Sequence, residues 1–199
     1  MNVSHKNLAK LGNSRVAKNP TILEIGAGRG EHFRFVKSDF QKYIMTDISN
    51  WGLKEVENII GQDARVSFEL HNIEKLGFCD NSFDRVICSC VLMHVDQPYD
   101  ALTEMYRVVK PGGVISFYLA CDPGMLLRLI RRIFITPKNN NLDVPYSLLV
   151  ALNHRNNGCS IIDMCKHVFK NDQIKFSYFP FHFRSWNLST HIIVDVVKS

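Results

Sequence analysis

The chain has 199 residues, enough for one domain with a substantial core and too few for two comfortable ones. Hydrophobic residues make up 46% and charged residues 22% of the sequence, a composition that excludes long disorder. The formal net charge of +5 is mild and does not by itself predict a nucleic-acid partner. We therefore expect a single domain over residues 1–199.

The apolar runs are all shorter than the roughly 18 residues that a membrane span needs, and the N-terminal residues lead into no long apolar run. The sequence therefore predicts neither an export signal nor a spanning segment. The six cysteines form no C-x-x-C pair and no regular framework, so neither a metal site nor a disulfide scaffold is expected. Reduced cysteines in this number are typical of cytoplasmic proteins, and we expect a cytoplasmic location.

Strand-length apolar runs alternate with stretches of helical periodicity, which is typical of an α/β sheet built from parallel crossovers. A helical candidate separates each run from the next. The candidate at Tyr99–Val109 repeats apolar residues at helical spacing and stops at Lys110-Pro111-Gly112-Gly113. The predicted strands are Thr21–Ile25, Tyr43–Asp47, Arg65–Leu70, Phe83–Cys90 and Val114–Leu119.

Residues 121–157 depart from this alternation and predict an insertion that covers one end of the sheet. The insertion contains two helix candidates, Met125–Ile135 and Tyr146–Leu152, separated by a polar loop at residues 137–141. After it come a helix-like stretch at Ile161–Phe169 and two strand-like runs with room for an antiparallel return, Ile174–Phe179 and His191–Val197.

A glycine-rich turn follows the first predicted strand and leads into a predicted helix. Such a turn lets the backbone approach a ligand closely, and a helix N-terminus offers free N–H groups. Gly26, Gly28 and Gly30 run G-x-G-x-G, and Glu31 stands where the dinucleotide fingerprint has its third glycine. A pyrophosphate would meet that carboxylate. Glu24 on the strand suits a ligand with an ammonium group and a sulfonium centre, such as the methionyl end of S-adenosylmethionine.

Asp47 closes the second predicted strand, twenty-one residues after Gly26. A carboxylate at this place can accept both hydroxyls of a ribose. An aspartate at a strand end, taken alone, is more often a turn former or a helix cap. Its ordered spacing from the glycine turn favours the ligand-binding interpretation.

Five segments in order resemble the successive motifs of the class I, S-adenosylmethionine-dependent methyltransferases. They cover residues 21–119, about half of the chain. The resemblance implies a Rossmann-like, doubly wound seven-stranded sheet that is mostly parallel with an antiparallel last strand. The segments are L-E-I-G-A-G-R-G at Leu23–Gly30, T-D-I-S around Asp47, F-D-R-V-I at Phe83–Ile87, V-L-M-H-V at Val91–Val95 and R-V-V-K-P-G-G at Arg107–Gly113.

The resemblance also implies the cofactor, S-adenosylmethionine, and the residues that hold it. In that family the glycine loop holds the methionyl part, the acid after the second strand binds ribose, and the loop after the third strand contacts adenine. That third loop has Asn72 and Gly77 where many relatives carry Asp and Pro, but an amide oxygen can still accept from the adenine amino group. The expected cofactor contacts are Glu24, Gly26, Ala27, Gly28, Gly30, His32, Asp47, Ile48, Asn72, Ile73, Ser89 and Cys90.

Two histidines are candidates for the acceptor side. If the acceptor is a hydroxyl, a general base must take its proton, and histidine is the natural base at neutral pH. His94 follows the fourth strand, at the carboxyl edge where open α/β sheets bind ligands, although it could instead pack the next loop with Asp96. His154 lies near the end of the insertion and suits an acceptor contact, the alternative being a polar helix start.

The helix candidate in the insertion separates apolar residues from Arg128, Arg131 and Arg132 on its two faces. One hypothesis is a lid helix packed on the sheet edge with solvated arginines. The other is a basic amphipathic helix, residues 125–135, that makes peripheral contact with a membrane surface. The aromatic and basic stretch Phe181–Leu188 is expected to pack beneath the sheet rather than to stack on RNA bases.

The sequence therefore predicts methyl transfer from S-adenosylmethionine to a small-molecule acceptor. The closing segment is similar to methyltransferases of bacterial surface-polysaccharide clusters, which favours an O-methyltransferase acting on a sugar or lipid-linked glycan hydroxyl. The alternatives are an RNA or protein methyltransferase, or a non-catalytic S-adenosylmethionine-binding module. Glu31 and the closing strands disfavour a NAD-binding oxidoreductase. Nucleic acid is not the expected partner, and no oligomeric state is predicted.

Overall fold

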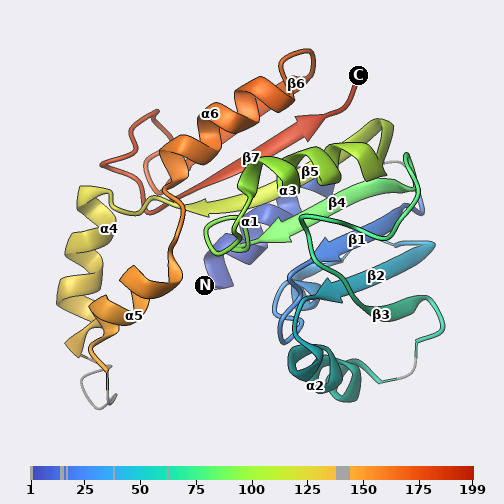
Figure 1. Cartoon of the computed structure of the whole chain (residues 1–199), viewed down its shortest axis with the longest axis horizontal. Coiled ribbons are helices and arrows are strands. Elements are labelled where there is room, and N and C mark those ends of the chain that lie inside the picture. Colours follow the sequence, from blue (N-terminus) through green and yellow to red (C-terminus); the bar gives the residue numbers. More distant parts are fainter. Residues whose placement is uncertain (1, 14–15, 17, 38, 62, 138–143) are drawn as a thin grey trace.

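The computed structural model describes residues 2–13, 16, 18–37, 39–61, 63–137 and 144–199 (Figure 1). Within these residues seven strands form one sheet in the order β3-β2-β1-β4-β5-β7-β6. Neighbouring strands pair in parallel except at β7, which is antiparallel to both β5 and β6. The predicted sheet is confirmed. The strands are β1 Thr21–Ile25, β2 Lys42–Asp47, β3 Val66–Leu70, β4 Phe83–Ser89, β5 Val109–Ala120, β6 Gln173–Phe179 and β7 His191–Val197.

Helices cover both faces of the sheet. Successive side chains of a strand point to opposite faces, so neighbouring residues of β1 join different clusters. Leu23 packs in the cluster that contains residues of α3 and α6, whereas Ile22 packs in the cluster that contains residues of α1 and α2. The sheet is therefore doubly wound. The helices are α1 Asn2–Asn13, α2 Asn50–Ile60, α3 Pro98–Val108, α4 Met125–Ile130, α5 Tyr146–Asn153 and α6 Gly158–Val168, with a 3-10 turn η1 at Phe33–Phe35 and a π-helical turn η2 at Arg131–Ile135.

The strand order reverses between β1 and β4. β1 pairs with β2 on one side, Leu23 opposite Ile44, and with β4 on the other, Leu23 opposite Val86. In open α/β sheets a crevice lies outside the carboxyl ends of the strands at such a reversal, because the connecting loops diverge to opposite faces. The fold therefore provides a ligand site at the end of β1, where the glycine turn begins.

Two predicted crossover helices are absent from the described residues. After the glycine turn there is only η1, and between β3 and β4 there is no helix. In the first crossover Phe33 and Phe40 pack edge-on against Tyr43, with ring centroids 5.0 and 5.4 Å apart, so aromatic packing replaces a helix. The expectation of a helix N-terminus at the glycine turn was therefore wrong.

β5 begins five residues earlier than predicted. Val109 already pairs with Phe83, and the next pair is Arg85 with Val114, so the intervening Pro-Gly-Gly stretch forms an irregularity within the strand. Gly112 takes a left-handed φ of 76° there. Helix α3 consequently passes directly into the strand, without the predicted turn.

The insertion, here called the cover (residues 121–157), lies at one end of the molecule beyond β5, with α4 and α5 next to each other (Figure 1). Its first helix is tied to the β6–β7 loop, because Leu126 N donates to Asn187 O at 2.9 Å. Most of the predicted polar loop, residues 138–141, lies outside the described residues. Within the described part of the chain, no helix is long and apolar enough to cross a bilayer.

The first hypothesis for α4, a lid packed on the sheet edge with solvated arginines, is wrong in two respects. The apolar side chains of Leu129 and Ile133 are about half exposed. Arg131 is not solvated, because its guanidinium lies 2.6 Å from the carboxylate of Asp122 and its side chain is largely buried. The β6–β7 loop follows the prediction only in part, because Trp186 packs against the core whereas Phe181 and Phe183 are exposed.

We predict that Gly30→Ala destabilises the fold far more than Gly61→Ala. Both glycines have left-handed φ angles, 68° and 75°, where alanine costs about 1 to 2 kcal/mol. A Cβ at Gly30 would also lie 2.1 Å from Val56 Cγ2, whereas none of the described atoms lies within 4 Å of a Cβ at Gly61. The resulting overpacking adds about 1 to 3 kcal/mol. Urea unfolding measures both variants, and equal losses would contradict the close contact.

Candidate functional site

The glycine turn at the end of β1 brings three segments together. Gly26, Gly28 and Gly30 all have positive φ, at 69°, 52° and 68°. A Cβ at Gly26 would lie 2.1 Å from a methyl of Val91, so only glycine allows the turn to touch the loop after β4. A Cβ at Gly28 would meet none of the described atoms within 4 Å. The turn is therefore packed tightly on both sides and open at its middle glycine.

Asp47, at the carboxyl end of β2, contacts the same turn. Its Oδ2 accepts a hydrogen bond from Gly28 N at 2.9 Å, and its Oδ1 accepts one from Ser49 N at 2.9 Å. Each carboxylate oxygen still has a lone pair for a further donor. The neighbouring Ile48 exposes most of its side chain and adds an apolar surface beside the carboxylate. This arrangement suits a ligand with hydroxyl donors next to a flat apolar group.

The loop after β3 supplies the next wall. Asn72 is exposed, and its Oδ1 accepts a hydrogen bond from Glu74 N at 2.9 Å, which shapes a local turn. Ile73 places its side chain in the hydrophobic core instead. Glu74 Oε1 in turn accepts from the backbone N–H groups of Asp96 and Gln97, both at 2.8 Å. The loops after β3 and β4 are thus joined.

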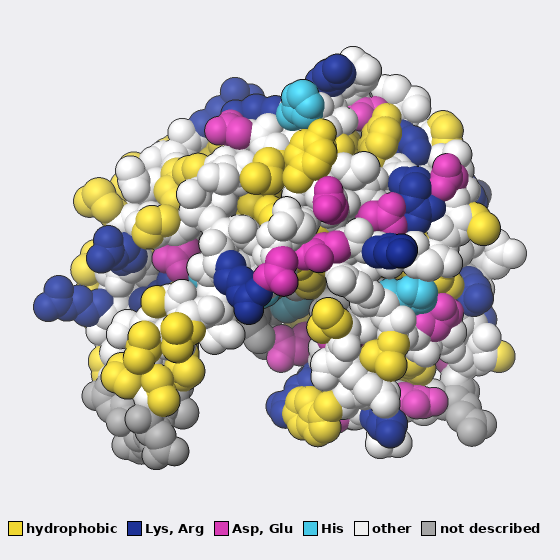
Figure 2. All heavy atoms as spheres, viewed as in Figure 1, with side chains coloured by type: hydrophobic (Ala, Val, Ile, Leu, Met, Phe, Trp, Pro, Cys, Tyr) yellow, Lys and Arg dark blue, Asp and Glu magenta, His cyan; other side chains and the backbone are white. Residues whose placement is uncertain are grey.

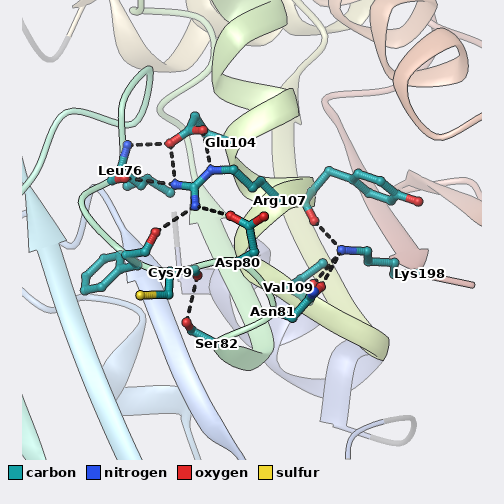
Figure 3. A network of polar contacts seen from close by, with 11 residues as sticks. Leu76, Cys79, Asp80, Asn81, Ser82, Glu104, Arg107, Val109 and Lys198 are labelled. Atoms are coloured by element: carbon teal, nitrogen blue, oxygen red, sulfur yellow. Dashed lines mark hydrogen bonds and ion pairs between the residues drawn. The ribbon is translucent and has the colours of Figure 1, made fainter.

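Arg107 of α3 holds this loop from the other side (Figure 3). Its guanidinium donates to the carbonyl oxygens of Leu76 and Phe78 at 2.9 and 2.7 Å. Glu104 pairs with the guanidinium at 2.7 Å and also accepts from Leu76 N at 2.7 Å. Arg107 begins the R-V-V-K-P-G-G segment, but the sequence predicted no role for it. In the structure it has a structural role, because it ties the loop after β3 to α3.

Glu24 and His32, two predicted cofactor contacts, lie in the interior beneath α1. Tyr43 donates its hydroxyl hydrogen to Glu24 Oε2 at 2.6 Å, and burial raises the pKa of Glu24 to about 7. Burial lowers the pKa of His32 to about 3, so its ring is neutral. Neither ring nitrogen of His32 has a hydrogen-bond partner among the described atoms. Direct contact of these two residues with the cofactor stays a prediction.

The end of β4 completes this side of the crevice. Ser89 Oγ lies 3.4 Å from His5 Nδ1 of α1. Cys90 follows with a φ of 62°, a conformation that is uncommon for a residue with a side chain and that recurs at functional sites. Burial raises the pKa of the Cys90 thiol to about 12, so it remains protonated and is no nucleophile.

His94 and His154, sixty residues apart in sequence, meet with ring centroids 5.1 Å apart. His94 Nδ1 lies 2.8 Å from Asn153 O, and its alternative partner Asp96 pairs instead with Arg155. His154 sits at the C-terminal cap of α5 rather than at a helix start. The structure thus brings together both histidines that the sequence singled out.

Asp122 orients His154 and was missed by sequence reasoning. Its Oδ2 lies 2.9 Å from His154 Nδ1 and 2.6 Å from Arg131 Nη1. Burial lowers the pKa of His154, and the hydrogen bond with Asp122 opposes that shift. The sequence could have pointed to Asp122 through its position, since it lies just after β5 at the carboxyl edge of the sheet.

A cavity of about 1160 Å³ opens beside this cluster, and its lining residues belong to the cover except for Met93 and Leu188. Figure 2 shows a notch between the α4–α5 end of the molecule and the rest of it. Met93, in the loop after β4, lines the cavity. Most of the other lining side chains are basic or apolar. The lining also includes Asp122, His154, Arg128, Arg131, Leu129 and Leu188.

The chain resembles known methyltransferases in sequence. Residues 23–117 match the family model described as "Methyltransferase domain". An uncharacterized methyltransferase of Schizosaccharomyces pombe is 33% identical over 126 residues, 56% of this chain and 42% of that protein. The ubiquinone/menaquinone biosynthesis C-methyltransferase UbiE of Enterobacter sp. is 35% identical over 106 residues, 50% of this chain and 42% of that protein. The matched region thus spans about two fifths of these relatives.

Solved structures share the fold. A methyltransferase of Thermotoga maritima, described as a possible histamine N-methyltransferase, has a TM-score of 0.67 at 18% identity and covers 100% of this chain and 89% of that one. The cyclase SpnF has a TM-score of 0.69 at 15% identity and covers 97% and 80%.

Residues 23–117 are therefore similar to a methyltransferase domain, and the structure has the fold of solved S-adenosylmethionine-dependent methyltransferases. This similarity implies S-adenosylmethionine as the cofactor, and the residues fit that molecule. Gly28 leaves open space at the turn, and Asp47 presents two fixed acceptors for ribose hydroxyls. Ile48 offers an apolar surface, and Asn72 stands at the edge of the methyltransferase crevice. The family match ends before the cover, whose residues line most of the cavity.

We expect Asp47→Ala to weaken binding of S-adenosylhomocysteine by at least about tenfold. A hydrogen bond to a charged group contributes about 1.5 to 3 kcal/mol, and about 1.4 kcal/mol corresponds to tenfold in affinity. Titration calorimetry measures the effect. Asp163→Ala is the control, because Asp163 pairs with Lys166 on the exposed face of α6. Unchanged affinity in Asp47→Ala would remove Asp47 from the site.

The raised pKa of Glu24 predicts a pH-dependent stability. The pKa of Glu24 is about 7 in the folded protein and about 4.3 in the unfolded chain. The stability that protonated Glu24 contributes is therefore fully present below about pH 4.3. It is lost as the pH rises through 7, which lowers the free energy of unfolding by roughly 3 to 4 kcal/mol. Glu24→Gln removes this titration, so the difference in unfolding free energy between wild type and variant should fall across that range. The exposed Glu57→Gln should show no such trend.

Proposed function

We propose that the protein transfers the methyl group of S-adenosylmethionine to a hydroxyl of a small-molecule acceptor, a sugar or a lipid-linked glycan. The observation that carries the proposal is the pair formed by Asp122 and His154 in the wall of the cavity, with His94 beside it. A hydroxyl needs a base to accept its proton during transfer. A carboxylate-oriented histidine is a suitable one.

His154 is the proposed base. When its Nδ1 hydrogen is donated to Asp122, Nε2 carries the lone pair and can accept the proton of an acceptor hydroxyl. Asp122 then stabilises the imidazolium that forms. The buried surroundings of His154 lower its pKa, so the ring is neutral and ready to accept a proton at neutral pH. S-adenosylmethionine supplies the activated methyl group.

Arg131 and His94 position this pair. Arg131 holds the carboxylate of Asp122 in place, with Nη1 and Oδ2 2.6 Å apart. The hydrogen bond from His94 to the carbonyl of Asn153, at 2.8 Å, anchors the end of α5 on which His154 stands. Precise placement of the base relative to the acceptor is a large part of such catalysis, since the methyl group is already activated.

The cover (residues 121–157) is proposed to close over the acceptor and exclude water from the methyl group. It contributes Asp122, Arg131 and His154 to a cavity that Met93 of the β4 loop also lines, which supports the expected single domain. All six cysteines are free thiols, which supports the expected cytoplasmic location.

The test is methyl transfer from labelled S-adenosylmethionine into polysaccharide, lipid, small-molecule, RNA and protein fractions of a cell extract. The proposal expects label in saccharide or lipid fractions, recovered after acid hydrolysis as an O-methyl sugar. His154→Ala should lower kcat about 10²- to 10⁴-fold, and Asp122→Asn should lower it less, both with unchanged affinity for S-adenosylhomocysteine. His167→Ala, an exposed histidine on α6, is the control. Label on carbon, or only in RNA or protein, would overturn the proposal.

A further inference from the structure

Apolar side chains gather on the outer surface of the cover. We call this set the apolar ridge. Its six members expose between 47% and 69% of their surface. Figure 2 shows hydrophobic side chains clustered over the α4–α5 end of the molecule, separate from the body. Soluble proteins rarely expose such clusters without a binding purpose. The members are Met125, Leu129, Ile133, Phe134, Leu148 and Leu152.

The segments that carry the apolar ridge, together with the neighbouring β6–β7 loop, contain basic residues and no acidic ones. The segments at residues 125–135, 146–153 and 181–188 contain four arginines and no aspartate or glutamate. Arg131 is engaged with Asp122, whereas Arg128, Arg132 and Arg184 are exposed. The β6–β7 loop that carries Arg184 is hydrogen-bonded to the start of α4 through Leu126 N. Apolar and cationic groups therefore share one end of the molecule.

The apolar ridge is continuous with the acceptor cavity. Met125 and Leu129 are exposed members of the ridge, and both also line the cavity together with Arg128 and Arg132. His154 lies on the lining of that same cavity. The apolar ridge and the wall of the cavity that holds His154 thus share two apolar side chains, Met125 and Leu129.

We propose that the apolar ridge and its arginines dock on the surface of an anionic lipid bilayer. Apolar side chains enter the acyl boundary while basic side chains meet anionic headgroups, which is the pattern of peripheral membrane proteins. A second copy of this chain fits less well. A twofold interface would bring the same arginines of both copies against each other. Docking of this kind presents the cavity to acceptors that reside in the bilayer.

The test is co-sedimentation of the full chain with vesicles, in the absence of cofactor and acceptor. Vesicles of phosphatidylcholine mixed with phosphatidylglycerol should bind the protein, pure phosphatidylcholine should bind it much less, and added salt should weaken binding. Ile133→Glu should weaken binding at least about tenfold. Its matched control is Ile59→Glu on α2, because both isoleucines are 53% exposed.

A second variant tests the charges without touching the apolar residues. Arg128→Gln with Arg132→Gln should weaken binding by about 30-fold. Arg34→Gln with Lys37→Gln removes the same charge from an exposed stretch near η1 and should weaken it far less. Thermal melting and S-adenosylhomocysteine affinity establish that each variant is folded.

Several results would overturn the docking proposal. These are no binding of wild type to mixed vesicles, equal binding to both vesicle types, or equal losses in Ile133→Glu and Ile59→Glu. Light scattering that shows a wild-type dimer and an Ile133→Glu monomer would assign the ridge to self-association instead. Because the assay needs neither cofactor nor acceptor, its failure is distinct from failure of the proposed methyl transfer.

Discussion

The close packing of the glycine turn is the constraint on which the rest of the site depends. Gly26 contacts Val91 and Gly30 contacts Val56, at distances that no side chain on the turn would permit. The first contact draws the loop after β4 toward β1, and the second fixes α2 against the turn. With both neighbours fixed, Gly28 N meets Asp47 and the middle of the turn remains open. A crevice at the strand-order reversal thus becomes a shaped cofactor site.

Hydrogen bonds connect the loops around the glycine turn to the cover. Glu74 joins the loop after β3 to the loop after β4 by accepting the backbone N–H groups of Asp96 and Gln97. Arg107 fastens the same loop to α3. The loop after β4 then meets the cover, because the backbone N–H of Arg155 donates to Met93 O at 3.0 Å. Cofactor loops and acceptor cavity are therefore one connected framework, which favours fixed placement of reacting groups over mobile ones.

The two halves of the domain differ in character. The cofactor half lies within the family match and is built on strands buried on both faces. The cover lies outside that match, exposes apolar and basic side chains and has its histidine and arginine held by a single carboxylate. A shared fold with acceptor loops that differ between relatives is the usual basis for different chemistries on one scaffold. The structural likeness to the cyclase SpnF is an example of one fold shared by proteins with different chemistries.

The sequence by itself determined the sheet, the cofactor turn and Asp47, because strand periodicity, glycine spacing and a strand-end carboxylate are local signals. It also singled out His94 and His154. Only the tertiary structure brought these two together, added Asp122 and Arg131, and buried Glu24 and His32 beneath α1. It also replaced a predicted helix with η1 and left Leu129 and Ile133 exposed. These outcomes depend on contacts between residues far apart in the chain, which periodicity within one segment does not encode.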